Sequence, residues 1–324
     1  MRIARWADPA GRVGEGFVIG ERVVAFPDDG TVAAVLESGL AGARALHARV
    51  ADDAGVALGD VRLLAPLKPA AIRDFVAFEE HVEGVTASVD GASQVVPEWY
   101  EAPTFYFTNP HTVLGPDDVL EPPVSERLDF ELELAAVIGG GTRDDGRTLT
   151  AQQAAERIFG YTIMNDWSAR DLQGREMKVR LGPAKGKDFG TSLGPWIVTA
   201  DEFEPLMDDD GFLAVRAEVR VNGELIGDDL VSNMGWPFPE LIAYASRNSR
   251  VVPGDVLGSG TVGHGGCLAE LWGRRGELSP PPLTEGDTVS MWVEGIGTLS
   301  NRVGAAVTAP AVAPARPRSR ARRR

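Results

Sequence analysis

Short stretches in which apolar and polar residues alternate recur along the chain, and they predict a protein built mainly from β-strands. Three of them, MRIARW, GFVIG and RVVAF, lie within residues 1–65. They precede VAAVLESGLAGARALHARV, whose apolar spacing predicts one or two short helices. These elements predict a small N-terminal domain. The prolines of LLAPLKP mark its boundary with a larger domain that extends over residues 66–304.

The larger domain shows the same alternation in many short segments separated by turn residues. They are FYFTN, FELELAAVI, YTIMND, PWIVTA, AVRAEVRVNGEL, DVLGSGTV and DTVSMWVEGIGTLSNRV. The clearest helix is predicted from Thr150 to Gly160, because Thr150 and Gln153 form a capping-box pattern and Gly160 is suited to end a helix. The 38 glycines and 22 prolines of the chain indicate frequent turns. Together these patterns predict an α+β, β-rich fold with mixed sheets rather than a doubly wound one.

Composition narrows the classes of partner. The net charge of −15 opposes binding to nucleic acid, whose phosphates are held by Lys and Arg. No apolar run approaches the roughly 20 residues that a membrane span needs, so no membrane partner is expected. The first residues lack the apolar stretch of a secretory signal, and Cys267, the single cysteine, cannot form an intrachain disulfide, so the sequence indicates a cytoplasmic protein.

Residues 305–324 consist mainly of Ala, Pro and Arg without amphipathic periodicity. Such a segment buries too little apolar surface to offset the entropy of ordering it, which predicts a disordered basic tail. A solvated tail is the simpler interpretation, and contact of its arginines with nucleic acid or anionic lipid is the alternative.

Two glutamates in FELELAAVI carry the first chemical signal. Side chains alternate along a strand, so Glu131 and Glu133 share one face while Leu132 and Leu134 share the other. Like charges placed so closely are unfavourable unless a cation lies between them, and Mg²⁺ and Ca²⁺ both prefer oxygen ligands. The alternative is an exposed strand face with two solvated glutamates.

A second signal lies in GYTIMNDWSARDLQ, where an apolar strand ends at Asp166. A strand end displays functional groups on a rigid frame, although Asp166 could instead cap a helix over SARDLQ. Arg170 and Gln173 are three residues apart and would face the same ligand. The glycine-rich loop GPAKGKDFGTSLGPW that follows holds Lys187 and Thr191, and a lysine near a metal site would anchor an anionic substrate group.

A possible proton-transfer group lies upstream in RDFVAFEEHVEG, where Asp74 precedes His81 by seven residues. Histidine is suited to proton transfer near neutral pH, although a lone histidine is more often structural. Near the end of the chain, PGDVLGSGTVGHGGCLAELW forms a glycine-rich turn that holds Thr261, His264 and Glu270. Its glycines either allow the backbone to approach a ligand closely or only form turns.

Four of these motifs, LDFELELAAVIG, GYTIMNDWSARDLQ, KGKDFGTSLGPW and PGDVLGSGTVG, together resemble the fumarylacetoacetate hydrolase family. The likeness covers residues 66–303, with the motifs in the family's order. It implies a mixed β-roll catalytic domain with a small N-terminal domain, the fumarylacetoacetate hydrolase fold. It also implies a homodimer, a small oxo-acid substrate and a Mg²⁺, Ca²⁺ or Mn²⁺ ion.

The resemblance further implies three groups of site residues. The metal ligands would be Asp74, Glu131, Glu133 and Asp166. The catalytic residues would be His81, Glu270, which orients this histidine, and Lys187. The substrate-binding residues would be Arg170, Gln173, Thr191 and Thr261.

The chain departs from the family at two positions. Where fumarylacetoacetase carries substrate-binding tyrosines, this chain has Val76 and Met177. These differences argue against fumarylacetoacetate as the substrate but leave the metal ligands and His81 in place.

The first prediction for the activity is therefore hydrolysis of a carbon–carbon bond in a 1,3-diketo or acylpyruvate-type acid, through a metal-bound enolate. Hydration, isomerisation or decarboxylation of a 2-oxo acid in aromatic catabolism is the alternative within the family. A glycosidase would use paired carboxylates without metal, usually from different strands and about 5 to 5.5 Å apart in retaining enzymes. A catalytically silent binding protein would be expected to have lost ligands or His81.

Overall fold

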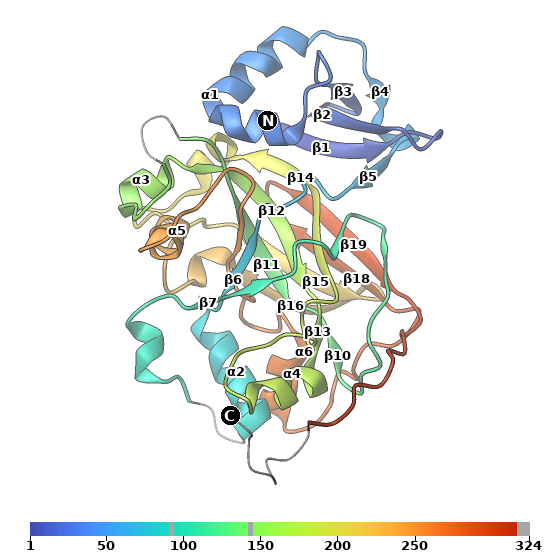
Figure 1. The fold of residues 1–324 in the computed structure, drawn as a ribbon, viewed down its shortest axis with the longest axis vertical. Helices are drawn as coiled ribbons and strands as arrows, with labels where there is room; N and C mark the ends of the chain where they lie inside the picture. Colours follow the sequence, from blue (N-terminus) through green and yellow to red (C-terminus); the bar gives the residue numbers. More distant parts are fainter. Residues whose placement is uncertain (91–93, 142–144, 316–324) are drawn as a thin grey trace, which may run out of the picture.

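The computed structural model describes residues 1–90, 94–141 and 145–315 (Figure 1). The strands of the larger sheet are β1 (Arg2–Ala7), β2 (Val13–Ile19), β3 (Arg22–Ala25), β4 (Val56–Ala57), β5 (Arg62–Leu64), β6 (Ile72–Phe75), β7 (Phe105–Thr108), β8 (Val113–Leu114), β11 (Leu132–Ile138), β12 (Ile158–Asp166), β14 (Thr191–Thr199) and β17 (Val256–Gly258). Their order is β4-β3-β2-β1-β14-β12-β11-β17-β6-β7, with β5 paired to β1 and β8 paired to β14.

A second sheet has the order β16-β15-β18-β19-β9. It contains β9 (Val119–Leu120), β15 (Arg216–Val221), β16 (Glu224–Leu230), β18 (Thr288–Val293) and β19 (Gly297–Val303), while β10 (Leu128–Asp129) pairs with β13 (Ser168–Ala169). Neighbouring strands run antiparallel in most pairs and parallel in β17–β6, β14–β8 and β19–β9. The predicted β-rich α+β fold with mixed sheets is confirmed.

Helices lie around these sheets. They are α1 (Val32–Val50), α2 (Glu79–Asp90), α3 (Ala151–Ala155), α4 (Arg170–Met177), α5 (Phe238–Ser246) and α6 (Leu268–Arg275), with the short 3₁₀ helices η1 (Leu58–Asp60), η2 (Pro97–Tyr100), η3 (Ala200–Leu206) and η4 (Val231–Asn233). Two of them, α2 and α6, lie side by side at the end of the molecule opposite the N-terminal strands (Figure 1). The sequence patterns did not predict either one.

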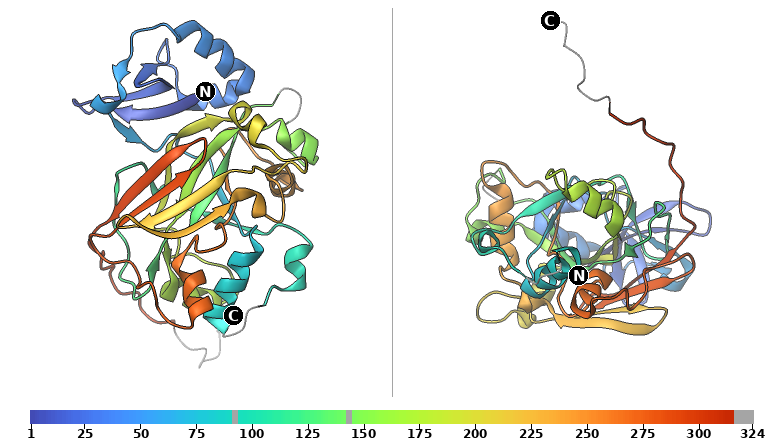
Figure 2. Two further views of the ribbon diagram at one scale, coloured as in Figure 1. Left: turned by 180° about the vertical axis from the view of Figure 1, so that it is seen from behind. Right: turned by 90° about the horizontal axis from the view of Figure 1, so that it is seen from below.

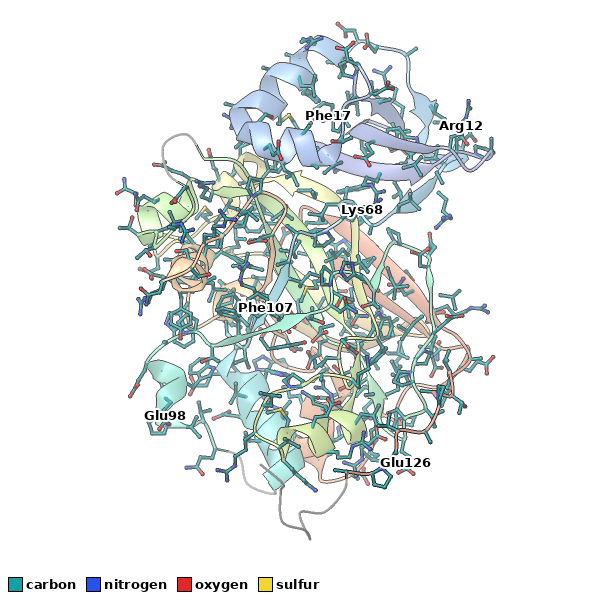
Figure 3. All side chains as sticks on the ribbon, in the orientation of Figure 1. Arg12, Phe17, Lys68, Glu98, Phe107 and Glu126 are labelled. Atoms are coloured by element: carbon teal, nitrogen blue, oxygen red, sulfur yellow. The ribbon has the colours of Figure 1, made fainter. Side chains whose placement is uncertain are left out.

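The N-terminal segment packs against the remainder of the chain through both its sheet and its helix. Strand β1 pairs with β14, so the larger sheet continues across the predicted domain boundary at residue 65. Phe17, labelled in Figure 3, is fully buried and belongs to the same apolar core as Val137 and Ile197. The helical segment predicted here is present and kinks at Gly39, where φ is +68°. The division into two domains stays a prediction.

The helix predicted from Thr150 to Gly160 is shorter than expected. Thr150 and Gln153 form the expected capping box, but α3 ends at Ala155 and β12 begins at Ile158. Gly160 is therefore a strand residue, packed so closely against β14 that a Cβ would lie 2.2 Å from the carbonyl oxygen of Val198. Burial and strand pairing of Ile158 and its neighbours outweigh the local helix signal.

The C-terminal tail leaves the second sheet after β19. The N–H of Val307 donates to the carbonyl of Pro122, and the residues that follow, up to 315, run away from the body of the molecule (Figure 2). Residues 316–324 lie outside the described residues, so disorder of the tail stays a prediction. In the described part of the chain, every helix is too short or too polar to cross a membrane.

Candidate metal centre

Four buried carboxylates meet at the centre of the larger sheet, and we call Asp74, Glu131, Glu133 and Asp166 the carboxylate cluster. Asp74 belongs to β6, Glu133 to β11 and Asp166 to the end of β12, while Glu131 directly precedes β11. Each residue is at most 4% exposed. They converge because β12, β11, β17 and β6 are consecutive neighbours in the sheet. This placement excludes the interpretation of solvated glutamates, and α4 begins after Ala169 rather than after Asp166.

A glycine makes room for this convergence. Gly258 of β17 lies opposite Asp74 in the parallel pair. A Cβ at this position would lie 2.6 Å from Oε2 of Glu133 and 2.8 Å from Oδ1 of Asp74. Any side chain here would therefore displace one of the two carboxylates.

Electrostatics make the cluster a strong attractor of positive charge. Burial and then the neighbouring carboxylates raise the pKa of Asp74 and of Glu133 well above their ordinary values. Burial also raises the pKa of Asp166, against the opposing charge of Lys187. Removing these carboxylates from water favours either a bound proton or a bound cation.

Two cationic side chains partly neutralise the cluster. Nζ of Lys187 lies 2.5 Å from Oε2 of Glu131 and 2.6 Å from Oδ2 of Asp166. Nη2 of Arg170 lies 2.7 Å from Oε1 of Glu131, and its Nε donates to Asp129. Burial alone would raise the pKa of Glu131, but these two cations outweigh burial and hold that pKa well below its ordinary value. Glu131 is therefore ionised at neutral pH.

The residues present fit a hard divalent cation. Oδ1 of Asp74, Oε1 of Glu133 and Oδ1 of Asp166 are buried and have no hydrogen-bond partner among the described residues. Carboxylate oxygens of Asp74, Glu131 and Asp166 all lie within 4.8 Å of one another. Mg²⁺, Ca²⁺ and Mn²⁺ prefer such oxygen ligands, and a bound cation would satisfy the oxygens that lack partners.

His81 lies on α2 beside the cluster and is 6% exposed. Its Nε2 is 3.9 Å from Oε1 of Glu131, and its Nδ1 is 3.6 Å from Sγ of Cys267. Burial lowers the pKa of His81 to about 4, against the opposing charge of Glu131. The imidazole is therefore neutral at pH 7 and can accept a proton.

Glu270, expected to orient this histidine, lies on α6 rather than in a glycine-rich turn. Its Oε2 accepts a hydrogen bond from the N–H of Gly265, and its Oε1 lies 3.0 Å from Nη2 of Arg274. Within the described residues, no hydrogen bond joins Glu270 to His81. The orienting role of Glu270 stays a prediction, and Cys267 occupies the position next to Nδ1.

The predicted substrate-binding residues surround the cluster. Gln173 accepts a hydrogen bond from Nη1 of Arg170 over 3.1 Å, so the two side chains lie on one face of α4, and their binding of a common ligand stays a prediction. Thr191 pairs with Asp166 in the sheet, and Thr261 follows Gly260 in the loop after β17; both threonines are buried. A cavity of about 710 Å³ opens beside Arg170 and Gln173. Its lining also includes Val85, Arg127, Arg175, Met177, Lys178 and Trp272.

Two functional side chains were missed by sequence reasoning. Tyr106 lies on β7 opposite Asp74, and its hydroxyl donates to Oδ2 of Asp166. Asp129 is fully buried and accepts from Nε of Arg170 and from two N–H groups at the start of α6. Alternation in FYFTN places Tyr106 and Thr108 on one face and gives a signal for Tyr106. Phe107, labelled in Figure 3, points to the other face and is exposed.

Comparison with known proteins identifies the family of the chain. The family model described as fumarylacetoacetate (FAA) hydrolase C-terminal matches residues 70–304. The fumarylacetoacetase of Arabidopsis thaliana is 30% identical over 68% of this chain and 63% of its own length. An oxaloacetate tautomerase of Bacillus subtilis is 32% identical over 76% of this chain and 74% of its own length.

A solved fumarylacetoacetate hydrolase of Exiguobacterium antarcticum superimposes with a TM-score of 0.69 at 28% identity. The match covers 94% of this chain and 99% of that one. The chain spans less than two thirds of the Arabidopsis fumarylacetoacetase. The match to the family model, which extends over most of the chain, shows that the protein belongs to the fumarylacetoacetate hydrolase family.

Proposed function

We propose that this protein is a divalent-metal-dependent hydrolase that cleaves a carbon–carbon bond in a 1,3-diketo or acylpyruvate-type oxo-acid. The observation that carries the proposal is the convergence of the buried carboxylate cluster with a neutral His81 beside it. Mg²⁺, or Ca²⁺ or Mn²⁺ in its place, held by the four carboxylates, would polarise the substrate carbonyl as a Lewis acid.

His81 supplies the base in this proposal. Its Nε2 faces the cluster and accepts a proton from water, whose oxygen then forms a bond to the carbonyl carbon beyond the bond that breaks. The electrons of the broken carbon–carbon bond remain with the departing carbon, which becomes an enolate and then takes up a proton. A pKa near 4 leaves His81 unprotonated and ready for the first step at neutral pH.

Lys187 and Arg170 neutralise the charge that develops on the enolate oxygen. Asp166 and Glu131 outweigh the effect of burial and raise the pKa of Lys187 above its ordinary value, so it stays protonated at the site. Asp129 and Glu131 hold the guanidinium of Arg170, and Gln173 accepts one further hydrogen bond from it. The neighbouring cavity is also lined by Arg127, Arg175 and Lys178 and by one carboxylate, Asp171, and this excess of positive charge suits a substrate with a further carboxylate.

The second candidate is interconversion of keto and enol forms of a 2-oxo acid. The relationship to the oxaloacetate tautomerase favours it, because this reaction needs only proton transfer next to a carbonyl. Hydration or decarboxylation would use the same cation and the same charged residues. The base beside the cluster favours hydrolysis over decarboxylation, and hydrolysis is our first assignment. We further propose a cytoplasmic homodimer that binds neither nucleic acid nor membrane, in keeping with the sequence-based predictions.

The test follows the ultraviolet absorbance of acylpyruvates, whose conjugated enol disappears on cleavage, in the presence of Mg²⁺. His81→Ala should lower turnover by roughly 10²- to 10⁴-fold while metal affinity stays near the parent's. His111→Ala is the matched control, because His111 is exposed at the surface. Full turnover by His81→Ala would exclude His81 as the base that activates water. Loss of enol absorbance in the parent without formation of the two cleavage products would instead assign keto–enol interconversion.

A further inference from the structure

Cys267 caps α6 and is a buried group without a role in the proposed reaction. The backbone N–H of Glu270 donates to its Sγ over 3.4 Å. The N–H groups of Leu268 and Ala269 donate to the two carboxylate oxygens of Asp129 over 2.8 and 3.0 Å. Three N–H groups at the start of the helix are thereby satisfied, and the sulfur is held in a fixed position.

The same sulfur contacts the imidazole of His81. Nδ1 lies 3.6 Å from Sγ, while Nε2, on the other side of the ring, lies 3.9 Å from Oε1 of Glu131. The two helices approach closely because Gly84 of α2 faces Glu270 of α6: a Cβ at Gly84 would lie 2.3 Å from Cγ of Glu270. The ring is therefore held between the sulfur and the carboxylate cluster.

We infer that Cys267 is a positioning residue that fixes the tautomer of His81, with Nδ1–H donating to Sγ and the lone pair on Nε2. The inference rests on the proposed function, in which Nε2 takes a proton from water. A neutral imidazole with a free Nε2 carries its hydrogen on Nδ1. In a buried site this N–H needs an acceptor, and Sγ lies next to it.

The opposite arrangement is chemically distinct. If the thiol S–H donated to Nδ1, the imidazole hydrogen would lie on Nε2, and the nitrogen that faces Glu131 could not accept a proton. The oxygens of Glu270 contact Gly265 and Arg274, and the atom next to Nδ1 is Sγ of Cys267. The choice therefore depends on which atom of the Cys267–His81 pair donates.

Nuclear magnetic resonance reads the tautomer directly. Two-bond ¹H–¹⁵N correlations are recorded on Mg²⁺-loaded protein labelled with ¹⁵N-histidine, and the signals of His81 are identified by their loss in His81→Gln. The parent and Cys267→Ser should show a pyridine-like Nε2 and a pyrrole-like Nδ1, because a hydroxyl accepts the same two hydrogens. Cys267→Ala should lose this single-tautomer signature. A hydrogen on Nε2 in the parent, or an unchanged spectrum in Cys267→Ala, would overturn the inference.

Kinetics provide the second measurement. Cys267→Ala should lower kcat by about 10- to 100-fold with little change in KM, the usual effect of removing a partner that orients a functional histidine. Cys267→Ser should restore most of the loss. Arg274→Ala is the control on the same helix, because it removes the ion pair with Glu270 and a hydrogen bond to the carbonyl of Glu80 on α2, and it thus loosens the contact between the two helices without changing the partner of Nδ1. An equal loss in Arg274→Ala and Cys267→Ala would assign the effect to the stability of α6 and contradict the inference.

The two proposals fail in different ways. If His81 is not the base, His81→Ala retains turnover whichever tautomer is present. If Cys267 does not position the ring, the tautomer signature shows it whichever substrate is cleaved. Should Cys267→Ala fail to fold, the spectra of the parent and of Cys267→Ser still decide, since a hydrogen on Nε2 in either contradicts the inference.

Discussion

Glu131 and Glu133 lie two residues apart and both belong to the carboxylate cluster, yet the charges next to them have opposite signs. Glu131 contacts the cations of Lys187 and Arg170, which outweigh burial and hold its pKa well below its ordinary value. Burial and the charge of Asp74 instead raise the pKa of Glu133 well above its ordinary value. Oε1 of Glu133 has no hydrogen-bond partner in the part of the chain that the structure describes.

The cluster is thus divided into a paired half, Glu131 and Asp166 with Lys187 between them, and an unpaired half, Asp74 and Glu133. In the paired half, the ammonium group of Lys187 supplies the positive charge. In the described part of the chain, no cationic side chain contacts the carboxylates of the unpaired half, and one oxygen of each lacks a hydrogen-bond partner, so this half needs a proton or a metal ion to be stable. Metal binding should therefore be linked most strongly to proton release from Asp74 and Glu133.

The largest effect is expected on removing the cation of the paired half. Lys187→Met leaves two buried carboxylates without this partner, which should lower the free energy of unfolding by about 3–5 kcal/mol in chelated protein. Urea denaturation measures the loss, and Mg²⁺ should recover part of it because a bound cation supplies the missing charge. Lys185→Met is the control, since Lys185 is exposed and its surface ion pair with Asp188 should contribute about 1 kcal/mol or less. Equal losses in the two variants would refute the division into halves.

The two glutamates should respond to neutralisation with opposite signs. In chelated protein, Glu131→Gln leaves buried cations with less compensation and should destabilise the fold by about 2–4 kcal/mol. Glu133→Gln removes a like-charge contact and should leave stability unchanged or raise it slightly. Both variants should lose Mg²⁺ affinity in calorimetry, because each replaces a charged carboxylate of the proposed metal site by a neutral amide. If both variants lost a similar free energy of unfolding, the contacts of Glu131 with Lys187 and Arg170 would not stabilise the fold.

The unpaired half should also give chelated protein a distinct pH dependence. The folded-state pKa values of Asp74 and Glu133 lie above the ordinary values of 3.8 and 4.5. Their contribution to stability is therefore complete below about pH 4 and is lost as the pH rises through the raised pKa values. The pKa of Glu131 is depressed instead. Its contribution to stability is therefore present at pH values above its ordinary pKa and is lost only in acid.

The expected result is a melting temperature of chelated protein that falls as the pH is raised from about 5 to about 8. Saturating Mg²⁺ should reduce or reverse this slope, because the ion favours the ionised carboxylates. Glu133→Gln should flatten the slope without metal. A melting temperature that rises over the same range in chelated protein would contradict raised pKa values in this half.

Strand alternation was enough to predict that Glu131 and Glu133 act together and that Asp166 ends a buried strand. It could not predict their different surroundings, because Lys187 arrives from a loop 56 residues after Glu131. Asp74 joins them only through the parallel pairing of β6 with β17, a contact between distant segments that leaves no local pattern. The family resemblance, rather than periodicity, identified it.

Helical residues of the site were the hardest to predict. The segment that holds His81 is largely polar, and the one that holds Glu270 has helical apolar spacing over only eight residues after a run of glycines, so neither was predicted as a helix. Their helices are stabilised by mutual packing at Gly84 and by the cap at Cys267, both of which depend on tertiary contacts. For the same reason the contact between His81 and Cys267 could not be foreseen.

The smallest effect is expected at the edge of the paired half. Gln173 accepts one hydrogen bond from Arg170, while Asp129 and Glu131 hold the same guanidinium through shorter contacts. Gln173→Ala should therefore leave Arg170 in place and lower the free energy of unfolding by only about 0.5–1.5 kcal/mol. Because the side chain also lines the cavity, KM for an acylpyruvate should rise several-fold while kcat stays near the parent's. A large fall in kcat would instead mean that Gln173 acts on the reacting atoms and not only on substrate binding.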